Sequence, residues 1–394
     1  MLSHRAVTNV CWPCRRPGCR IHREHVGKQL SLKKLSISLF FIAAKDSIYL
    51  RLMAWEILSV VPRVYRSMNI PTQQAPSMVS RADIESLLKE VQKRTANPQA
   101  GIFGPQSVSW KINREAAVFL GAGRAALLQL AHPWVAAALD QHSTTLADPI
   151  GRFHNTFRVI YTMVFGSENQ VLAAARHMHA LHTRIRGELT EAAGGYDAGT
   201  HYEANERNAL RWVYATLVES AVLAYDFALP ALTAVEKESY YAESKWMAAL
   251  FGIAPDDLPK DWNAFAIYNQ EMWASDKLGV TAKSRFMGHR ILHGSGSWVH
   301  PPEWYRAMTA FWMPERLRKE FQLRFGPAEQ HALARARRWV PAVYRKLPSS
   351  VRHVGAYHEA QAGLAGKRNP GPLARASNRF WMGQSRLMFS ESGK

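Results

Sequence analysis

The sequence predicts an all-α protein built around one large helical domain, over residues 78–350. Apolar residues recur at helical spacing through most of that range, and we find no internal repeat and no convincing alternating strand segment. Glycines at segment ends and prolines in first turns separate the helical patterns. With 394 residues, 47% of them hydrophobic, the chain is long enough to bury a large core.

The helices are expected in the following order. The first covers residues 81–94, with Ser80 as N-cap. A second covers 113–139 and is broken near Pro133. The helix over 233–251 begins with the capping signal Thr233-x-x-Glu236. The remaining helices are expected over residues 152–165, 167–192, 204–227, 261–276, 302–313, 314–325, 327–340 and 341–346.

One glycine motif suggests a different fold. Gly121-x-Gly123-x-x-Ala126 follows an apolar run and is close to the dinucleotide-binding fingerprint. A Rossmann domain needs strand–helix alternation, and no second βαβ unit follows. We therefore expect both glycines on a helix, where each costs about 1 kcal/mol relative to alanine unless a close approach requires it. Dinucleotide binding is the less favoured alternative.

The N-terminal part is expected to be an appendage. Residues 1–46 form a basic extension, disordered or targeting, and 47–77 an amphipathic helix and linker. All three cysteines lie in the extension and offer, with one histidine, four zinc ligands at tight spacing: Cys11, Cys14, Cys19 and His22. The four-residue gap leaves little room for a zinc fold, so an unstructured extension is favoured. The apolar run 35–44 is too short to span a bilayer.

The net charge of +19 is concentrated near the two ends, including a basic C-terminal tail over 351–394. Such clusters can meet nucleic acid or anionic lipid, although a solvated basic surface is the more common outcome. We expect a cytoplasmic protein without a nucleic-acid partner. Peripheral contact with an anionic membrane and a targeting role for the N-terminal segment stay open.

Several of the sixteen histidines lie on apolar helical segments: His132, His142, His154, His177, His179 and His182. His179 and His182 are three residues apart and share a helix face, from which His177 is turned away. A lone histidine is usually a satisfied core residue, but one neutral imidazole in an apolar cavity is also what a haem iron requires. No Glu-x-x-His pair is present, which disfavours a carboxylate di-iron site.

Four blocks in order carry a family resemblance: "GAGRAALLQLAHPWVAAALDQHS", "RFHNTFRVIYTMVFG", "LHTRIRG" and "YEANERNALRWVYATLVESAVLAY". They resemble the MpaB-type oxygenase and rubber oxygenase (latex clearing protein) family from about residue 113 to 281. The resemblance implies an all-α fold that encloses a b-type haem. It also implies oxidative cleavage of carbon–carbon double bonds in isoprenoid chains with dioxygen.

The resemblance assigns site residues. Arg152 and Thr156 match an arginine and a threonine beside the haem, and His182 matches the axial ligand of a block that Ile185 and Gly187 complete. A guanidinium can pair with a haem propionate or a developing oxyanion. The alternative is that Arg152 pairs with Asp148 and that the Thr156 hydroxyl bonds its own helix carbonyl.

Two departures from the family pattern leave the substrate open. Asn155 stands where rubber oxygenases carry a basic residue, and Tyr214 lies in a block where many relatives carry histidine. Tyr214 is a core residue, a donor to bound oxygen or an iron ligand.

The sequence thus predicts a haem b-dependent oxygenase that acts with dioxygen on an apolar, isoprenoid or lipid-like substrate. The alternative is a non-catalytic haem- or lipid-binding helical protein at a membrane surface. The general base is not assigned, and His132 and His142 are candidates within the matched block.

Overall fold

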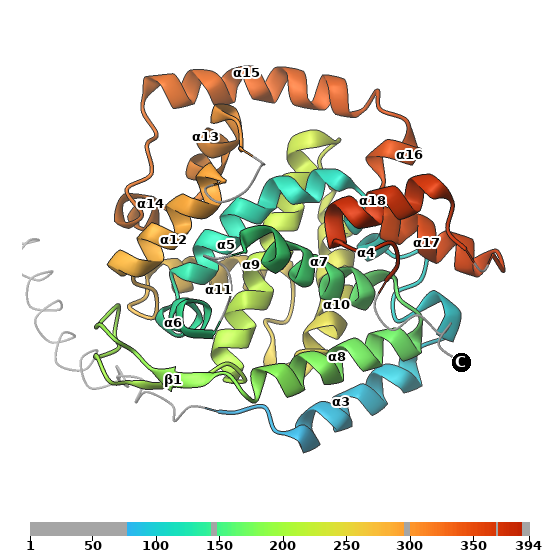
Figure 1. Ribbon diagram of the computed structural model, residues 1–394, viewed down its shortest axis with the longest axis horizontal. Helices are drawn as coiled ribbons and strands as arrows, with labels where there is room; N and C mark the ends of the chain where they lie inside the picture. Colours follow the sequence, from blue (N-terminus) through green and yellow to red (C-terminus); the bar gives the residue numbers. More distant parts are fainter. Residues whose placement is uncertain (1–76, 143–147, 295–299, 368, 388–394) are drawn as a thin grey trace, which may run out of the picture. The chain divides into compact units, whose positions relative to one another are not determined.

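Helices make up most of the chain in the computed structural model, which describes residues 77–142, 148–294, 300–367 and 369–387 (Figure 1). These residues belong to one unit that begins at Ala75. Three expectations lie outside the described residues. They are the basic extension over 1–46, the amphipathic helix and linker over 47–77 (except for residue 77), and the zinc alternative at Cys11, Cys14, Cys19 and His22. Within the described ranges the all-α prediction is confirmed.

The α-helices of the described chain are α3 (Arg81–Arg94), α4 (Val108–Asn113), α5 (Ala122–Leu130), α6 (Pro133–His142), α7 (Pro149–Phe165), α8 (Glu168–His182), α9 (Arg207–Ala228), α10 (Ala234–Ala249), α11 (Trp262–Ala274), α12 (Ala282–His293), α13 (Glu303–Trp312), α14 (Glu315–Glu320), α15 (Pro327–Tyr344), α16 (Ser349–Arg352), α17 (Gly355–Leu364) and α18 (Pro372–Met382). Short 3₁₀ helices are η1 (Pro98–Ala100), η2 (Ala116–Gly121) and η3 (Pro255–Asp257). Two strands, β1 (Arg186–Glu188) and β2 (His201–Glu203), pair antiparallel.

Local capping explains where the predicted helices begin. The Ser80 hydroxyl accepts a hydrogen bond from the Asp83 amide, and the Asp83 carboxylate accepts one from the Ser80 amide. Thr233 and Glu236 form the same reciprocal pair at α10. Both N-termini therefore lie where the sequence places them, because side chains satisfy backbone amides that a helix leaves unbonded.

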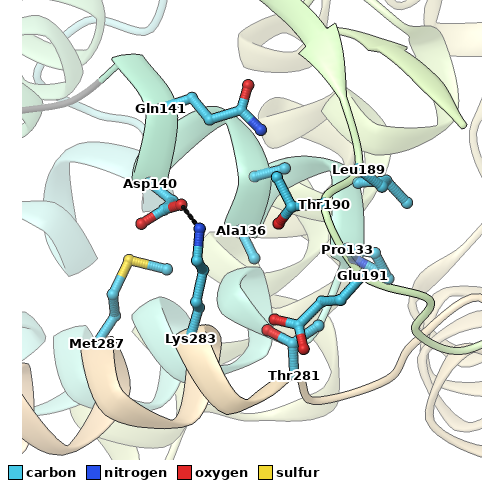
Figure 2. Close-up of a pocket in the computed structure, with 11 residues that line it drawn as sticks. Pro133, Ala136, Asp140, Gln141, Leu189, Thr190, Glu191, Thr281, Lys283 and Met287 are labelled. Atoms are coloured by element: carbon cyan, nitrogen blue, oxygen red, sulfur yellow. Dashed lines mark hydrogen bonds and ion pairs between the residues drawn. The ribbon is translucent and has the colours of Figure 1, made fainter. Parts of the chain in front are cut away.

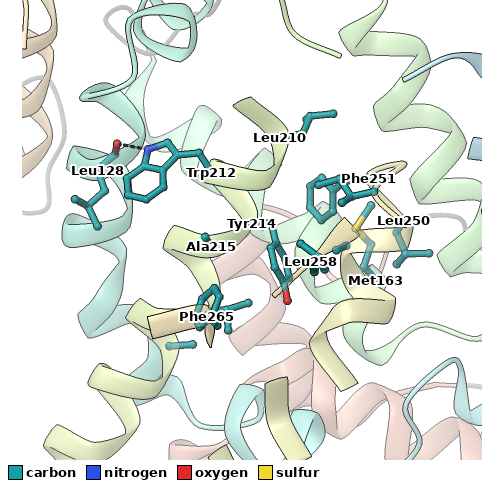
Figure 3. Close-up of a cluster of buried hydrophobic side chains, with 14 of the residues drawn as sticks. Leu128, Met163, Leu210, Trp212, Tyr214, Ala215, Leu250, Phe251, Leu258 and Phe265 are labelled. Atoms are coloured by element: carbon teal, nitrogen blue, oxygen red, sulfur yellow. Dashed lines mark hydrogen bonds between the residues drawn. The ribbon is translucent and has the colours of Figure 1, made fainter. Parts of the chain in front are cut away.

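Helix α9 forms the centre of the core. It is 22 residues long, and η2, α5, α10, α15 and α4 all pack against it. Trp212 on α9 is buried, and its indole nitrogen donates to the Leu128 carbonyl of α5 at 2.8 Å (Figure 3). Burial of such large side chains provides the main stabilisation of the domain.

The glycine motif lies at a close helix contact. Gly121 ends η2, and Gly123 lies in α5. A Cβ on Gly121 would lie 2.4 Å from the Ser220 carbonyl oxygen of α9, and one on Gly123 would lie 2.9 Å from the Tyr305 hydroxyl. The glycines are therefore required by helix packing, and no strand precedes them in the described chain.

Two helix predictions are wrong in detail. Residues 186–188 were expected within a long helix but form β1, because α8 ends at His182 and the chain turns back through Gly194 and Gly195 to pair with β2. Pro341 was expected to separate two helices, but α15 continues through it to Tyr344. The carbonyl of Arg337, which Pro341 leaves without its helical donor, belongs to an exposed residue, where water can replace the bond.

The described part of the expected C-terminal tail contains helices. α17 and α18 pack against each other and against α7. The indole of Trp381 stacks on Phe119 with ring centroids 3.5 Å apart, and the guanidinium of Arg158 donates to the Met382 carbonyl at 3.0 Å. The C-terminal helices therefore support the helix that carries Arg152 and Thr156.

Candidate functional site

Helices α7 and α8 bring the three predicted site residues together. The two helices pack against each other and are joined only by Gly166 and Ser167, which makes them an antiparallel pair. Arg152 lies 13 residues before the end of α7 and His182 14 residues after the start of α8, so each lies roughly 20 Å from the connection at 1.5 Å per residue. The first turns of α7 and the last turn of α8 thus meet.

Arg152 and Thr156 interact on one face of α7. Arg152 Nη1 donates to Thr156 Oγ1 at 3.1 Å, and Thr156 Oγ1 donates to the Arg152 carbonyl at 3.0 Å. Asp148 instead caps the helix by accepting from the Gly151 amide at 2.8 Å, and among the described residues no ion pair joins it to Arg152. The expected Thr156 bond to its helix carbonyl forms, but the Arg152–Asp148 pair does not.

Arg152 is a cation with no carboxylate partner among the described residues. Its side chain is partly buried, and this burial lowers the pKa of the guanidinium from its ordinary value. A desolvated charge is stable only when a counter-charge or hydrogen bonds compensate it. The site is therefore suited to an anionic ligand group.

His182 is the last residue of α8, and its side chain is mostly enclosed. Its Nδ1 atom is buried and has no hydrogen-bond partner among the described residues. Burial, then the positive charge of Arg152, then His179 lower the pKa of His182 to about 4. The imidazole is therefore neutral at physiological pH, which is the form that binds a metal ion.

The residues after His182 hold the end of α8 in place. The Ile185 amide donates to the His182 carbonyl at 3.0 Å, and the Ile185 side chain packs into a cluster with Trp134 and Tyr202. Gly187 lies in β1, where a Cβ would approach the Tyr202 hydroxyl to 2.9 Å. The spacing of these three residues thus has a structural cause. His182 ends the helix, Ile185 anchors the chain in an apolar cluster, and Gly187 allows close contact at the strand.

Asn205 is a positioning residue that no sequence motif indicated. Its buried amide donates to the Thr183 hydroxyl at 3.0 Å and to the His179 carbonyl at 3.3 Å. It therefore satisfies a carbonyl in the last turn of α8. A polar residue just before a long apolar helix is a common N-terminal feature, so the sequence offered no separate signal for this role.

Tyr214 lies on α9, and its side chain belongs to the apolar core of the domain (Figure 3). Its hydroxyl is 2.7 Å from the Ser244 hydroxyl, and burial raises the pKa of Tyr214 well above its ordinary value. The phenol is therefore neutral and already hydrogen-bonded. Asn155, the other departure from the family pattern, is exposed on α7.

A second histidine shares some features of His182. His132 is buried, and its Nδ1 finds no hydrogen-bond partner in the described part of the chain. Burial, followed by the charge of Lys277, lowers the pKa of His132 to about 4. Its ring lies 5.9 Å from the Tyr196 ring. The Nε2 of His142 instead lies 3.0 Å from the Arg186 carbonyl on the surface, so His142 acts as a structural contact.

A surface pocket between α6, α12 and the segment after β1 is a separate feature (Figure 2). Lys283 pairs there with Asp140 at 2.8 Å, next to Gln141, Thr190 and Glu191. The pocket does not include Arg152, Thr156, His182 or Tyr214 among its lining residues. The ion pair neutralises its main cation, so this pocket and the helix-pair site have different chemistry.

The described part of the chain offers no full set of side-chain ligands for a metal ion. Within the described ranges, no group of three or more His, Cys, Asp or Glu side chains could hold an ion between them. A haem already supplies four nitrogen ligands from its macrocycle and needs only an axial ligand from the protein. Of the helices in these ranges, none combines the length and hydropathy needed to cross a bilayer.

The fold and site define an all-α protein with a histidine, an arginine and a threonine gathered on a helical pair. Comparison with known families identifies it further. The profile described as "ER-bound oxygenase mpaB/B'/Rubber oxygenase, catalytic domain" matches residues 110–342, and the chain belongs to this family. It therefore carries an oxygenase-type catalytic domain, as the resemblance predicted. No curated protein and no solved structure matches the chain.

Proposed function

We propose that the chain is a haem b-dependent oxygenase that acts on an apolar, isoprenoid or lipid-like substrate. The observation that carries this proposal is the juxtaposition of Arg152 and His182. The Arg152 guanidinium lies close enough to the neutral His182 imidazole to lower its pKa. Within the described ranges the guanidinium has no carboxylate partner, and the buried Nδ1 of His182 has no hydrogen-bond partner. Haem b would supply an iron centre for the imidazole and anionic propionates for the guanidinium.

Each residue has a distinct role in this proposal. His182 would bind the haem iron, and Asn205 holds the helix end that carries His182. Arg152 would pair with a propionate. Thr156 restrains the Arg152 guanidinium through the 3.1 Å hydrogen bond and thereby acts as a positioning residue. When bound, the haem iron would supply the dioxygen chemistry that these side chains cannot perform themselves.

The surroundings of the site support an apolar substrate. Phe153, Phe157 and Ile160 are partly exposed on α7 beside the Arg152–Thr156 pair. Phe157 packs against Phe119 at 4.4 Å between ring centroids, within a cluster of aromatic rings. Such side chains favour hydrocarbon over charged groups. The reaction would cleave one C=C bond with one dioxygen molecule, so that each new carbonyl takes one oxygen atom.

The location of the enzyme is also a proposal. The family description names an ER-bound oxygenase, whereas the sequence led us to expect a cytoplasmic protein, with peripheral membrane contact left open. Both locations are compatible with an enzyme that binds to the surface of a membrane, where apolar substrates collect.

The test begins with an absorption spectrum of the purified full chain with equimolar haem. A Soret band that titrates to one haem per chain is expected, and an unshifted spectrum of free haem would refute the haem site. Dioxygen uptake is then measured with squalene, an isoprenoid alkene, and with its saturated analogue squalane. Uptake with squalene alone supports the oxygenase. A stoichiometric Soret band without uptake on any alkene lipid tested would favour the haem-binding alternative.

A further inference from the structure

The C-terminal helices present an unusually one-sided charge. Between residues 331 and 390 the chain has eleven lysines and arginines and one acidic residue, Glu359. Glu359 is engaged internally, because it accepts hydrogen bonds from the Asn378 side chain and the Leu387 amide. The positive charge of these helices is therefore not offset along their own segment.

Apolar side chains lie exposed among these cations. Leu373 on α18 is 68% exposed and Val351 on α16 is 61% exposed, and Val343 at the end of α15 and Leu347 between α15 and α16 are also exposed. We call these four residues, together with Arg345, Lys346, Arg375 and Arg379, the C-terminal face. All four of its cations are exposed, and within the described chain none of them pairs with a carboxylate.

The geometry of α18 keeps both kinds of side chain outside. Ala374 and Asn378 are buried, and the Ser377 hydroxyl accepts from the Gly355 amide at 2.9 Å, so this side of α18 packs on the start of α17. Leu373 lies on one flank of the side that remains, and the i,i+4 pair of Arg375 and Arg379 lies on the opposite flank. The exposed half of α18 is thus amphipathic in its own right.

A buried contact fixes the α15–α16 part of the face. The Tyr344 hydroxyl donates to the buried Glu115 carboxylate at 3.0 Å, and Arg352 forms an ion pair with the same carboxylate at 2.9 Å. Because Tyr344 and Arg352 both point inward, the intervening turn is held with Arg345, Lys346 and Leu347 outward. In Figure 1, α15 runs along the top of the view, and its end leads through α16 into α17, which packs on α18.

We propose that the C-terminal face is a docking surface for an anionic lipid bilayer. Cations without carboxylate partners are attracted to acidic headgroups, and exposed aliphatic side chains can enter the headgroup boundary. A nucleic acid would use the cations but would gain little from exposed leucine and valine. The proposal specifies the membrane contact of the proposed function, and it does not depend on haem binding or oxygenase activity.

The test is flotation of the full chain with vesicles of phosphatidylcholine alone or with about one third phosphatidylserine. Wild-type protein should bind only the phosphatidylserine vesicles, and less at high salt because exposed charges are screened. Each basic residue near such a surface raises partitioning about fivefold, so Arg375→Gln with Arg379→Gln should lower it about thirtyfold. Lys89→Gln with Lys93→Gln is the matched control, since these two exposed cations have the same i,i+4 spacing on α3.

The apolar part of the face is tested separately. Leu373→Ser with Val351→Ser should weaken binding to anionic vesicles while leaving the salt dependence in place. Val235→Ser removes an equally exposed valine, 75% exposed on α10, and should have no effect. These variants are compared by light scattering, because a self-association surface would show a change of oligomeric state instead.

Three outcomes would overturn the proposal. Equal losses in the α3 control and the α18 variant would show that only net charge matters. Unchanged vesicle binding in both C-terminal variants would place the contact elsewhere in the chain. Binding to duplex DNA at least as tight as to anionic vesicles, and insensitive to the apolar variant, would identify a nucleic-acid surface. A normal Soret band in every variant would keep these results separate from those for the haem site.

Discussion

Arg152 and Thr156 hold each other through two hydrogen bonds across one turn of α7, 3.1 Å from the guanidinium to the hydroxyl and 3.0 Å from the hydroxyl to the Arg152 carbonyl. The second bond is common for threonine in helices, but the first one is informative. It restrains a guanidinium that no carboxylate of the described chain neutralises. The Arg152–Thr156 pair therefore holds the guanidinium in place and leaves its charge available to an anionic ligand.

Replacement of His182 by alanine should abolish haem retention. Without His182, only Arg152 and apolar contacts would remain to hold the haem, and we expect its affinity to fall by more than about a hundredfold. Haem titration followed at the Soret band measures it. His177→Ala, on an exposed part of the same helix, is the control. If the His182 variant binds normally and His132→Ala or Tyr214→Phe does not, the ligand is misassigned.

Replacement of Arg152 by glutamine should weaken haem binding about tenfold to a hundredfold, the range for one charged hydrogen-bond partner. Arg152→Lys should recover part of that loss, because lysine keeps the charge but not the planar donor geometry. Thr156→Val should have a smaller effect in the same direction. The exposed Arg81→Gln variant controls for net charge. Identical affinity in all four variants would argue against a propionate at this site.

Acid should destabilise the haem-free protein between about pH 6.5 and pH 4. His132 and His182 both have a folded-state pKa of about 4, below the unfolded value of 6.5, so in this window the unfolded state binds more protons. Their contribution is complete above pH 6.5 and declines as the pH falls, by up to about 3 kcal/mol each. Urea unfolding of the wild type and of His132→Leu and His182→Leu, at pH 4.5 and pH 7, measures it. Equal pH dependence in all three proteins would contradict the prediction.

Replacement of Gly121 by alanine should destabilise the fold by about 1–3 kcal/mol, because the new methyl group would meet backbone only 2.4 Å away. Gly363→Ala, where a Cβ would meet nothing within 4 Å, is the matched control in α17. Thermal unfolding measures both. Calorimetry with NAD, NADP and FAD should show no binding to the wild type. Tight binding of any of them would reopen the dinucleotide interpretation of the glycine motif.

Replacement of Glu115 by glutamine should cost about 3–5 kcal/mol, as expected when one partner of a buried ion pair is removed. Glu115 is 2% exposed, and Arg352 and His353 contact its carboxylate. Burial alone would raise the pKa of Glu115, but His353 and Arg352 outweigh it and hold the pKa below its ordinary value. Denaturant unfolding of Glu115→Gln and of the exposed Glu90→Gln provides the comparison. A similar small loss in both would show that the ion pairs contribute little.

The sequence alone determined the fold class, most helix positions and the family. Helical spacing, the capping signals at Ser80 and Thr233, and the order of four motif blocks are local or sequential properties, and they need no knowledge of what packs against what. The same locality explains the error after His182. The segment that forms β1 pairs with residues 201–203, more than ten positions away, and no local pattern encodes that partner.

Tertiary structure decided which residues meet. Only the antiparallel packing of α7 and α8 brings Arg152 close enough to His182 to lower its pKa, because the two are thirty positions apart in the sequence. Packing also placed the Tyr214 hydroxyl beside Ser244 in the core. The described part of the expected C-terminal tail forms helices, and α17 and α18 pack against α7. Burial, close approach and charge interaction depend on the distances between atoms in the folded chain, and the order of residues does not contain those distances.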